Sequence, residues 1–326
     1  MNLVITNRCS RRCEYCFQRE WFLESSERGL QEMSPDMFGK VVECMQSKEY
    51  ALLGGEPLLH SNIDEILAYC LDNGIVLGIM SNISVPHNIV VNVVKNYGKI
   101  ICCWLINTDY TDEQRDLFME NLQTIVSESG EETLLTPATT LVPREGGVDA
   151  SINRLDYIFQ HIPSKRIADI RLSTTTPTHN GVFKTYDYTQ QVEKLIKTLR
   201  ELHGNLHFYF DCPPTGCEIN RTLTDRYCEV LKRCTRFCNT PVVDVMPDGK
   251  VYWCASSTFL YLENVFDYHS EREVKYALKD KWKAYWQQQN FSNECRSCAY
   301  LKPDICYGLC AGKHYAVNNN FSDEKQ

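Results

Sequence analysis

Six short apolar runs alternate with six helical patterns over residues 1–203, and this alternation is the strongest constraint on the fold. The predicted strands cover Leu3–Thr6, Tyr50–Leu53, Val76–Met80, Ile100–Ile106, Leu134–Val142 and Asp169–Ser173. The predicted helices lie at 34–47, 62–73, 86–96, 112–129, 150–161 and 187–203. Strands separated by helices pair in parallel through right-handed crossovers, which predicts an α/β sheet. This pattern alone allows either a doubly wound sheet or a barrel.

Two of the predicted helices begin with capping residues. Ser34 followed by Pro35 fits an N-cap and a proline in the first helical position. Thr111 with Gln114 fits a capping box, in which the two side chains bond to each other's backbone N–H groups. Both signals support the helix starts that the apolar periodicity predicts.

Three cysteines directly follow the first predicted strand with the spacing C-x3-C-x2-C, namely Cys9, Cys13 and Cys16. Thiolates are soft ligands that select iron–sulfur clusters or zinc. Three of them can hold one face of a [4Fe–4S] cluster and leave the fourth iron open for chemistry. The alternative is a zinc knuckle, but zinc sites usually show two C-x2-C pairs or mixtures of Cys and His.

A glycine-rich turn, Gly54-Gly55-Glu56-Pro57, follows the second predicted strand. Parallel α/β folds build their sites at the carboxyl ends of the strands. The cysteine motif and this turn both lie at such ends, so we expect them to come together in the fold.

The cysteine motif and the GGEP turn together resemble the radical S-adenosylmethionine (radical SAM) superfamily. This resemblance implies an open partial (β/α)6 TIM-like barrel over residues 1–210. It also implies a [4Fe–4S] cluster on the three cysteines, whose free iron chelates the amino and carboxylate groups of SAM. The turn then accepts hydrogen bonds from the SAM amino group. The cofactor-binding residues that the resemblance implies are Tyr15, Gly54, Gly55, Glu56, Pro57, Ser81 and Asn82.

The chain changes character at a turn-rich junction near residue 211, because ten of its seventeen cysteines lie beyond that point. Short strands are predicted at Val242–Val245 and Lys250–Trp253, around a Pro-Asp-Gly turn, and a helix is predicted at 271–289. We therefore predict a second, small α+β domain at 211–326. Four earlier cysteines have no ligand spacing and are predicted to pack in the core, namely Cys44, Cys70, Cys102 and Cys103.

The cysteines of this second region resemble the SPASM extension of radical SAM enzymes, which carries two auxiliary [4Fe–4S] clusters. By that resemblance, Cys238, Cys254, Cys310 and an upstream partner hold the first cluster. The preferred upstream partner is Cys234, with Cys228 as the alternative. The second cluster is then held by Cys295, Cys298 and Cys306.

The chain departs from the SPASM pattern in two ways. Seven residues separate Cys298 from Cys306, which is longer than usual, and the cysteine expected after Cys310 is missing. The missing ligand is replaced by Cys212, Cys217, Cys228, a carboxylate or His314, or one auxiliary iron stays open. One or two structural zinc sites are the alternative reading of the whole region.

Composition excludes several classes of function. The chain has 34 basic and 42 acidic residues, a formal charge of -8 and no long basic run, so we expect no nucleic-acid partner. It has neither an apolar stretch of membrane-spanning length nor an export signal. Clustered cysteines in a long chain without an export signal indicate a metalloprotein of a reducing compartment. We therefore predict a cytoplasmic protein that does not bind membranes.

The resemblance implies reductive cleavage of SAM to a 5′-deoxyadenosyl radical, which takes a hydrogen atom from a substrate. Family members with this extension mostly modify peptides, so the leading hypothesis is a ribosomal peptide maturase that oxidises or crosslinks a precursor peptide. The expected partners are that peptide and a flavodoxin- or ferredoxin-type electron donor. Because the chain begins eight residues before Cys9, we also expect any leader-binding protein to be separate.

Two alternatives stand beside this hypothesis: a radical SAM dehydrogenase acting on a small molecule, and a non-catalytic metal-binding scaffold. The catalytic residues stay unassigned. The candidates are Cys217, as a hydrogen-atom donor at the domain junction, and Asp109, at the end of the fourth strand. Arg171, in the sixth strand, is expected to pair with a carboxylate of SAM or of the substrate, or with Glu56.

Overall fold

The computed structural model describes residues 1–16, 32–175, 186–211, 241–254 and 260–288. It also describes the shorter pieces 18, 27, 29, 218–219, 221–227, 229, 231–232, 257 and 296–298. Within these residues one continuous sheet of eleven strands forms the framework, in the order β11-β10-β9-β1-β2-β3-β4-β5-β6-β7-β8.

The first six strands are the predicted ones, and each pairs in parallel with the next. They are β1 (Asn2–Thr6), β2 (Glu49–Gly54), β3 (Val76–Ser81), β4 (Ile101–Asn107), β5 (Leu134–Leu141) and β6 (Ile170–Thr174). The helices between them are α2 (Pro35–Met45), α3 (Ile63–Asp72), α4 (His87–Tyr97), α5 (Arg115–Glu128), α6 (Gly147–Phe159) and α7 (Thr189–His203). The parallel α/β class is therefore confirmed.

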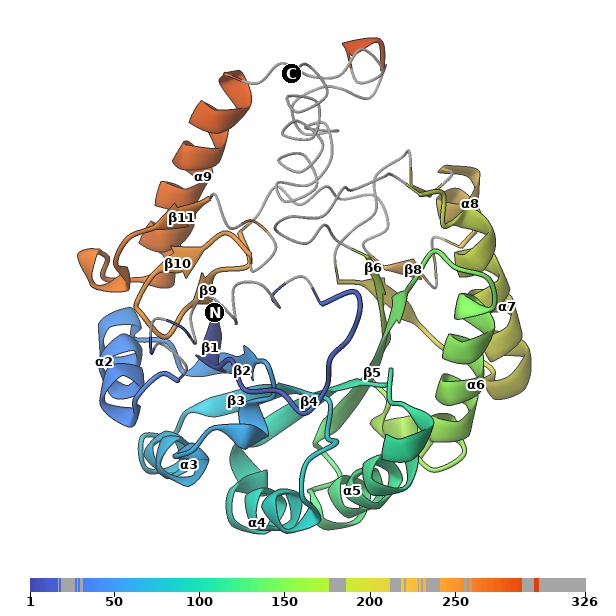
Figure 1. Ribbon diagram of the computed structural model, residues 1–326, viewed down its shortest axis with the longest axis horizontal. Helices are drawn as coiled ribbons and strands as arrows, with labels where there is room; N and C mark the ends of the chain where they lie inside the picture. The colour runs from blue at the N-terminus through green and yellow to red at the C-terminus, as the bar shows by residue number, and fades with distance from the viewer. Residues whose placement is uncertain are drawn as a thin grey trace.

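The sheet curves into an open barrel, with the helices α2 to α7 on its outer face (Figure 1). Strand side chains that face these helices are fully buried, as Ile170 and Leu172 of β6 are, while Arg171 and Ser173, which alternate with them, are only half-buried. This alternation follows from the two-residue repeat of a strand. The partial barrel that the family resemblance implied is consistent with this curvature.

Two further parallel strands extend the sheet past the sixth, namely β7 (Phe208–Phe210) and β8 (Leu231–Lys232). Helix α8 (Arg221–Arg226) lies between them in sequence. These strands were not predicted, because runs of three and two residues carry too little periodicity to be recognised in a sequence.

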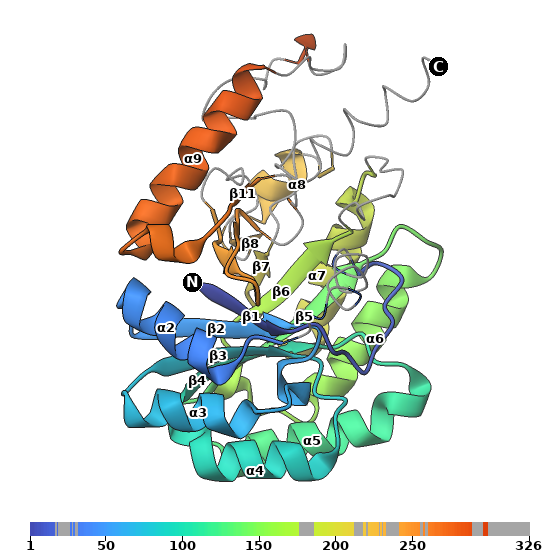
Figure 2. The ribbon, with the colours of Figure 1, turned by 60° about the vertical axis from the view of Figure 1, so that its left-hand side comes forward.

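The other edge of the sheet is built by the second half of the chain. Strands β9 (Asp244–Val245), β10 (Val251–Tyr252) and β11 (Tyr261–Leu262) form antiparallel pairs, and β9 joins β1 in parallel. Helix α9 (Glu271–Gln287) packs beside them through Trp253 and Trp282, whose rings lie 6.1 Å apart (Figure 2). The predicted strands and helix of this region are present, but their hairpin continues the barrel sheet. The domain boundary near residue 211 stays a prediction.

Short 3-10 helices complete the framework: η1 (Pro57–Leu59), η2 (Gly98–Ile100), η3 (Asp112–Gln114), η4 (Ser164–Arg166) and η5 (Val265–Asp267). The Ser34 side chain caps α2 as predicted, accepting from the backbone of Met37, and Thr111 and Gln114 form the expected capping box before η3. Of the cysteines predicted to pack in the core, Cys70 is buried. Cys102 is exposed, so the prediction is wrong there.

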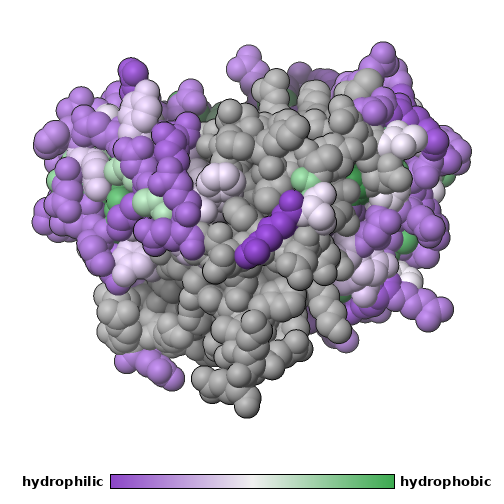
Figure 3. Space-filling view, turned by 90° about the horizontal axis from the view of Figure 1, so that it is seen from above, coloured by the Kyte–Doolittle hydropathy of each residue, from purple (hydrophilic) through white to green (hydrophobic). Residues whose placement is uncertain are grey.

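No helix in the described part of the chain is both long enough and apolar enough to cross a membrane. The large hydrophobic side chains that are exposed are spread over several elements, for example Val76, Leu134, Leu202 and Tyr276. In the view from above, the described residues on either side are mainly hydrophilic, with small scattered hydrophobic spots (Figure 3).

Candidate functional site

The glycine turn after β2 packs directly on the backbone that leads from β1 into the cysteine motif. The Gly55 N–H donates to the Thr6 carbonyl at 2.8 Å, and the Glu56 N–H donates to the Arg8 carbonyl at 2.7 Å. A Cβ atom on Gly54 would lie 2.1 Å from the Thr6 oxygen, and one on Gly55 would lie 2.3 Å from the Arg8 oxygen. Only glycine allows this approach, and Gly54 also has φ of +151°.

Glu56 connects this turn to the end of β3. Its carboxylate is fully buried and accepts from the Ser81 hydroxyl at 2.7 Å, from the Asn82 N–H at 2.7 Å and from the Leu58 N–H at 3.2 Å. Burial raises the pKa of Glu56, and these three donors oppose the shift. The turn and the end of β3 therefore form one hydrogen-bonded unit.

Asn82 extends this unit to the first cysteine. Its side-chain nitrogen lies 3.7 Å from the Cys9 sulfur, and its side-chain oxygen accepts from the Ser10 hydroxyl at 3.3 Å. The next residue, Ile83, has φ of +46°, a conformation that β-branched residues rarely adopt. The Asn121 side chain of α5 holds it there by donating to the carbonyls of Ile83 and Val85 at 2.7 and 2.8 Å.

Arg11, inside the cysteine motif, ties that loop to the ends of β3 and β4. Its guanidinium donates to the Asn82 carbonyl at 2.9 Å and to the Ser84 hydroxyl at 2.8 Å. It also donates to the side-chain and main-chain oxygens of Asn107, at 2.9 and 3.2 Å. No role was predicted for Arg11, although its place between two predicted cluster cysteines was a visible signal.

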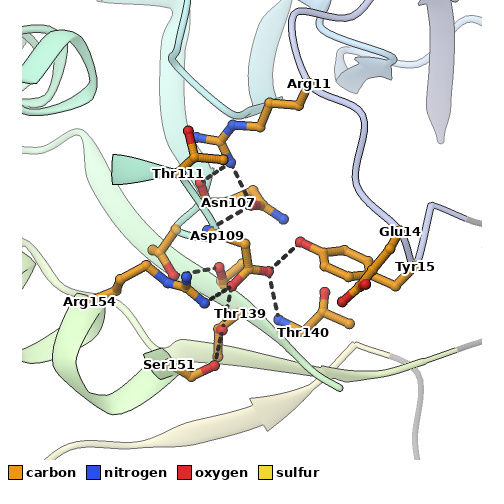
Figure 4. Close-up of polar contacts among 12 residues, drawn as sticks. Arg11, Glu14, Tyr15, Asn107, Asp109, Thr111, Thr139, Thr140, Ser151 and Arg154 are labelled. Carbon is orange, nitrogen blue, oxygen red and sulfur yellow. Dashed lines mark hydrogen bonds and ion pairs between the residues drawn. The ribbon is translucent and has the colours of Figure 1, made fainter. Parts of the chain in front are cut away.

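Tyr15 fastens the other end of the loop, since its hydroxyl donates to Asp109 at 2.5 Å. The same carboxylate accepts from the Thr139 hydroxyl, the Thr140 N–H and the Arg154 guanidinium, at 2.8, 3.0 and 3.2 Å (Figure 4). Burial, together with the Asp109 charge, raises the pKa of Tyr15. Both oxygens of Asp109 are thus occupied by protein donors.

The three cysteines lie together on the loop that follows β1, and all three remain thiols. Cys9 is exposed at the residue level, but its sulfur accepts from the Arg11 N–H at 3.4 Å, and desolvation of the thiol raises its pKa to about 11. Burial likewise raises the pKa of Cys13. The backbone turns between Cys13 and Cys16 through a hydrogen bond of 3.2 Å.

The three thiols lie within electrostatic range of one another. Among the described residues, no group of three His, Cys, Asp or Glu side chains is arranged to hold a single metal ion. A [4Fe–4S] cluster does not require such convergence, because each thiolate binds a different iron. The soft donor set and the glycine turn directly beneath the loop suit a cluster with one open iron. We infer that the residues present fit this cofactor.

Most of the predicted auxiliary ligands lie outside the described residues: Cys234, Cys238, Cys295, Cys306 and Cys310, as does the catalytic candidate Cys217. Cys254 is half-buried at the end of the β10 hairpin, where its N–H donates to Ser257 at 3.2 Å, and Cys298 is exposed. Arg171 pairs with Asp211 at 2.9 Å and lies over the Tyr209 ring. Of the partners expected for Arg171, Glu56 is therefore not the one found.

A family model described as the Radical SAM superfamily matches residues 3–105, which include the cysteine motif, the glycine turn and the end of β3. No curated protein matches the chain. Among solved structures, Streptococcus suis SuiB bound to S-adenosylmethionine is 15% identical over 95% of this chain and 72% of its own, with a TM-score of 0.63. SuiB bound to the precursor peptide SuiA gives a TM-score of 0.64 at 15% identity, over 95% of this chain and 71% of its own. At this identity the likeness shows a shared fold.

Proposed function

From the radical SAM domain that this chain carries, we propose that it is an enzyme that cleaves SAM reductively and removes a hydrogen atom from a peptide. When bound, the cluster and SAM supply the one-electron reduction and the radical, and that chemistry belongs to the cofactors. The protein's part is to hold, orient and enclose them. Cys9, Cys13 and Cys16 would hold the cluster, and the Gly54–Pro57 turn with Ser81 and Asn82 would form the SAM side of the site.

One observation carries this proposal: the glycine turn and the cysteine loop are built as a single unit. Gly55 and Glu56 bond to the backbone just before Cys9, while the Glu56 carboxylate bonds to Asn82, which reaches the Cys9 sulfur. A metal loop and a cofactor turn that are locked together position two bound groups relative to each other. Such fixed positioning is the main contribution that a protein makes to a reaction between bound groups.

The peptide substrate is supported by the likeness to SuiB, whose fold this chain shares and which has been seen with a precursor peptide. Oxidation of a peptide requires the removal of a second electron, and auxiliary clusters on the cysteines of residues 211–326 would offer the route. We therefore propose the ligand set Cys234, Cys238, Cys254 and Cys310, with Cys295, Cys298 and Cys306 for a second cluster.

Two further expectations belong to this proposal. A flavodoxin- or ferredoxin-type protein would deliver the electron. A reducing, cytoplasmic setting would suit both the thiols and the cluster. The second candidate function is a dehydrogenase of small molecules.

Anaerobic reconstitution with iron and sulfide, followed by dithionite reduction in the presence of SAM, tests the first half of the proposal. We expect 5′-deoxyadenosine from the wild-type protein and none from Cys13→Ala. Cys102→Ala is the matched control, because this thiol is exposed and far from the motif in sequence, and it should behave as wild type. A reconstituted wild-type protein that forms no 5′-deoxyadenosine would contradict the proposal and leave the metal-binding scaffold.

Short peptides encoded beside the gene test the second half. Each is incubated with the reduced protein and SAM, and its mass is compared before and after. A mass decrease equal to lost hydrogen atoms supports a peptide maturase. If 5′-deoxyadenosine forms but no peptide changes mass, the small-molecule dehydrogenase is favoured instead.

A further inference from the structure

Arg11 is a buried cation whose hydrogen-bond acceptors are all neutral. Only 8% of the residue is exposed. Its two terminal nitrogens donate to two carbonyls, one amide oxygen and one hydroxyl, supplied by Asn82, Ser84 and Asn107. Its Nε is buried and has no hydrogen-bond partner. In the described part of the chain, no carboxylate accepts a hydrogen bond from this guanidinium.

This environment is unusual, because a charge removed from water is normally paired, and an unpaired one is costly by several kcal/mol. The nearby carboxylates are committed elsewhere: Glu56 to Ser81, Asn82 and Leu58, and Asp109 to its own donors. The other groups within electrostatic range are the Tyr15 hydroxyl and the Cys13 thiol, and Cys13 belongs to the cluster motif. In the described part of the chain, Glu56 and Asp109 attract Arg11 through space, but neither bonds to it, so Arg11 lacks a negative charge in direct contact.

The group expected beside Arg11 would supply that charge. A [4Fe–4S] cluster on three thiolates is anionic, since the thiolates outweigh the positive charge of the iron–sulfur core, and its reduction adds one more negative charge. Net charge and hydrogen bonding around a cluster set its reduction potential. A cation fixed beside the cluster in a low-dielectric setting favours the reduced form.

We propose that Arg11 is the counter-charge of the cluster held by Cys9, Cys13 and Cys16, a positioning residue that makes the cluster easier to reduce. This inference rests on the proposed function, because it requires the cluster. It assigns the unpaired Nε–H of Arg11, and the negative charge in direct contact that Arg11 lacks, to a partner that is not protein.

The competing hypothesis is a purely structural role, called a brace below, in which Arg11 acts only by hydrogen-bonding the cysteine loop to the ends of β3 and β4. The two readings differ in one measurable quantity. A brace affects how well the cluster is retained, whereas a counter-charge also shifts the reduction potential of the cluster that is retained. The adjacent arginine offers a matched control, since Arg12 is exposed and carries the same charge one residue away.

The experiment measures the reduction potential of the reconstituted cluster by a dye-mediated titration with dithionite, followed by electron paramagnetic resonance of the reduced [4Fe–4S] signal. Auxiliary signals are removed by subtracting a spectrum of the Cys9→Ala, Cys13→Ala, Cys16→Ala protein. Arg11→Gln, Arg11→Met and Arg11→Lys are compared with wild type and Arg12→Gln. The two neutral Arg11 variants differ in packing, so the test does not depend on one of them folding.

We expect both neutral Arg11 variants to make reduction at least tenfold less favourable, a fall of about 59 mV for a one-electron couple. The reduction potentials of the Arg11→Lys and Arg12→Gln proteins should stay near the wild-type value. The inference is overturned if either neutral variant retains the cluster at the wild-type reduction potential. It is overturned as well if the reduction potential of Arg11→Lys falls as far as that of Arg11→Gln. It is also overturned if both neutral variants lose the cluster while Arg11→Lys retains it at a lowered potential. A wild-type protein with no subtractable [4Fe–4S] signal would instead contradict the proposed function.

Discussion

The Tyr15 hydroxyl donates a 2.5 Å hydrogen bond to Asp109, and this contact joins the cysteine loop to the end of β4. Asp109 was a candidate catalytic residue on the strength of its place at a strand end. Its carboxylate also accepts from Thr139, Thr140 and Arg154. A carboxylate engaged by four donors is poorly available as a base, so we now infer that Asp109 positions the loop.

Tyr15 and Asp109 should contribute unequally to stability. Tyr15→Phe removes one hydrogen bond and is expected to lower the free energy of unfolding by about 1 kcal/mol. Asp109→Ala strands several donors, including the partly buried Arg154 guanidinium, and is expected to lower it by about 3 kcal/mol. Urea denaturation of the cluster-free proteins measures both values. Equal losses in the two variants would count against Asp109 as the centre of this network.

The contact between the glycine turn and β1 predicts a sharp effect at Gly54. A methyl group there would lie 2.1 Å from the Thr6 carbonyl oxygen. This oxygen belongs to the backbone, so it cannot rotate out of the way as a flexible side chain can. Gly54→Ala should therefore displace the turn from the cysteine loop and reduce 5′-deoxyadenosine formation by about a hundredfold. Gly130→Ala is the control, since a Cβ atom there meets nothing within 4 Å. Near-normal activity in Gly54→Ala would show that the turn does not position SAM.

Two opposing effects meet at Ile83, which is fully buried and has φ of +46°. Removing its side chain costs about 2–5 kcal/mol in lost packing. A left-handed conformation costs a non-glycine residue about 1–2 kcal/mol, and glycine loses about 0.5–1 kcal/mol more than alanine in backbone entropy. We expect both Ile83→Ala and Ile83→Gly to be less stable than wild type. The free energy of unfolding of the glycine variant should exceed that of the alanine variant by about 0.5–1 kcal/mol. Thermal denaturation ranks the stabilities of the three proteins. A higher melting temperature for Ile83→Ala than for Ile83→Gly would contradict backbone strain at this position.

Glu56 gives a prediction for pH. Burial raises its pKa above the usual 4.5, so the folded protein favours the neutral acid. A group with a raised folded pKa contributes stability below the unfolded pKa and loses that contribution as pH rises through the folded pKa. The stability of wild type relative to Glu56→Gln should therefore fall as pH rises above 4.5. Denaturation of both proteins between about pH 4 and about pH 8 measures this difference, and a rising difference would contradict it.

The sequence was sufficient for the first six strands, because each is long enough to show its apolar run between two amphipathic helices. It also predicted that the glycine turn and the cysteine motif come together, since parallel strands end at one edge, and the turn does bond to the backbone before Cys9. Arg11 was not foreseen, because the adjacent Arg11 and Arg12 are identical in a sequence and only burial separates them. The pairing of β9 with β1 was missed for a related reason: it joins Asn2 to Asp244, a contact that no local pattern encodes.

Iron content separates one auxiliary cluster from two. With the SAM-site cluster and two auxiliary clusters, the reconstituted wild-type protein should hold about twelve iron atoms per chain, and about eight with one auxiliary cluster. Replacing Cys9, Cys13 and Cys16 together with alanine should remove about four of these, because the auxiliary ligands lie elsewhere in the chain. Cys102→Ala should leave the count unchanged, since this exposed thiol belongs to neither motif. Iron and sulfide assays with Mössbauer spectra give the counts, and a wild-type protein with about four iron atoms would remove the auxiliary clusters from the proposal.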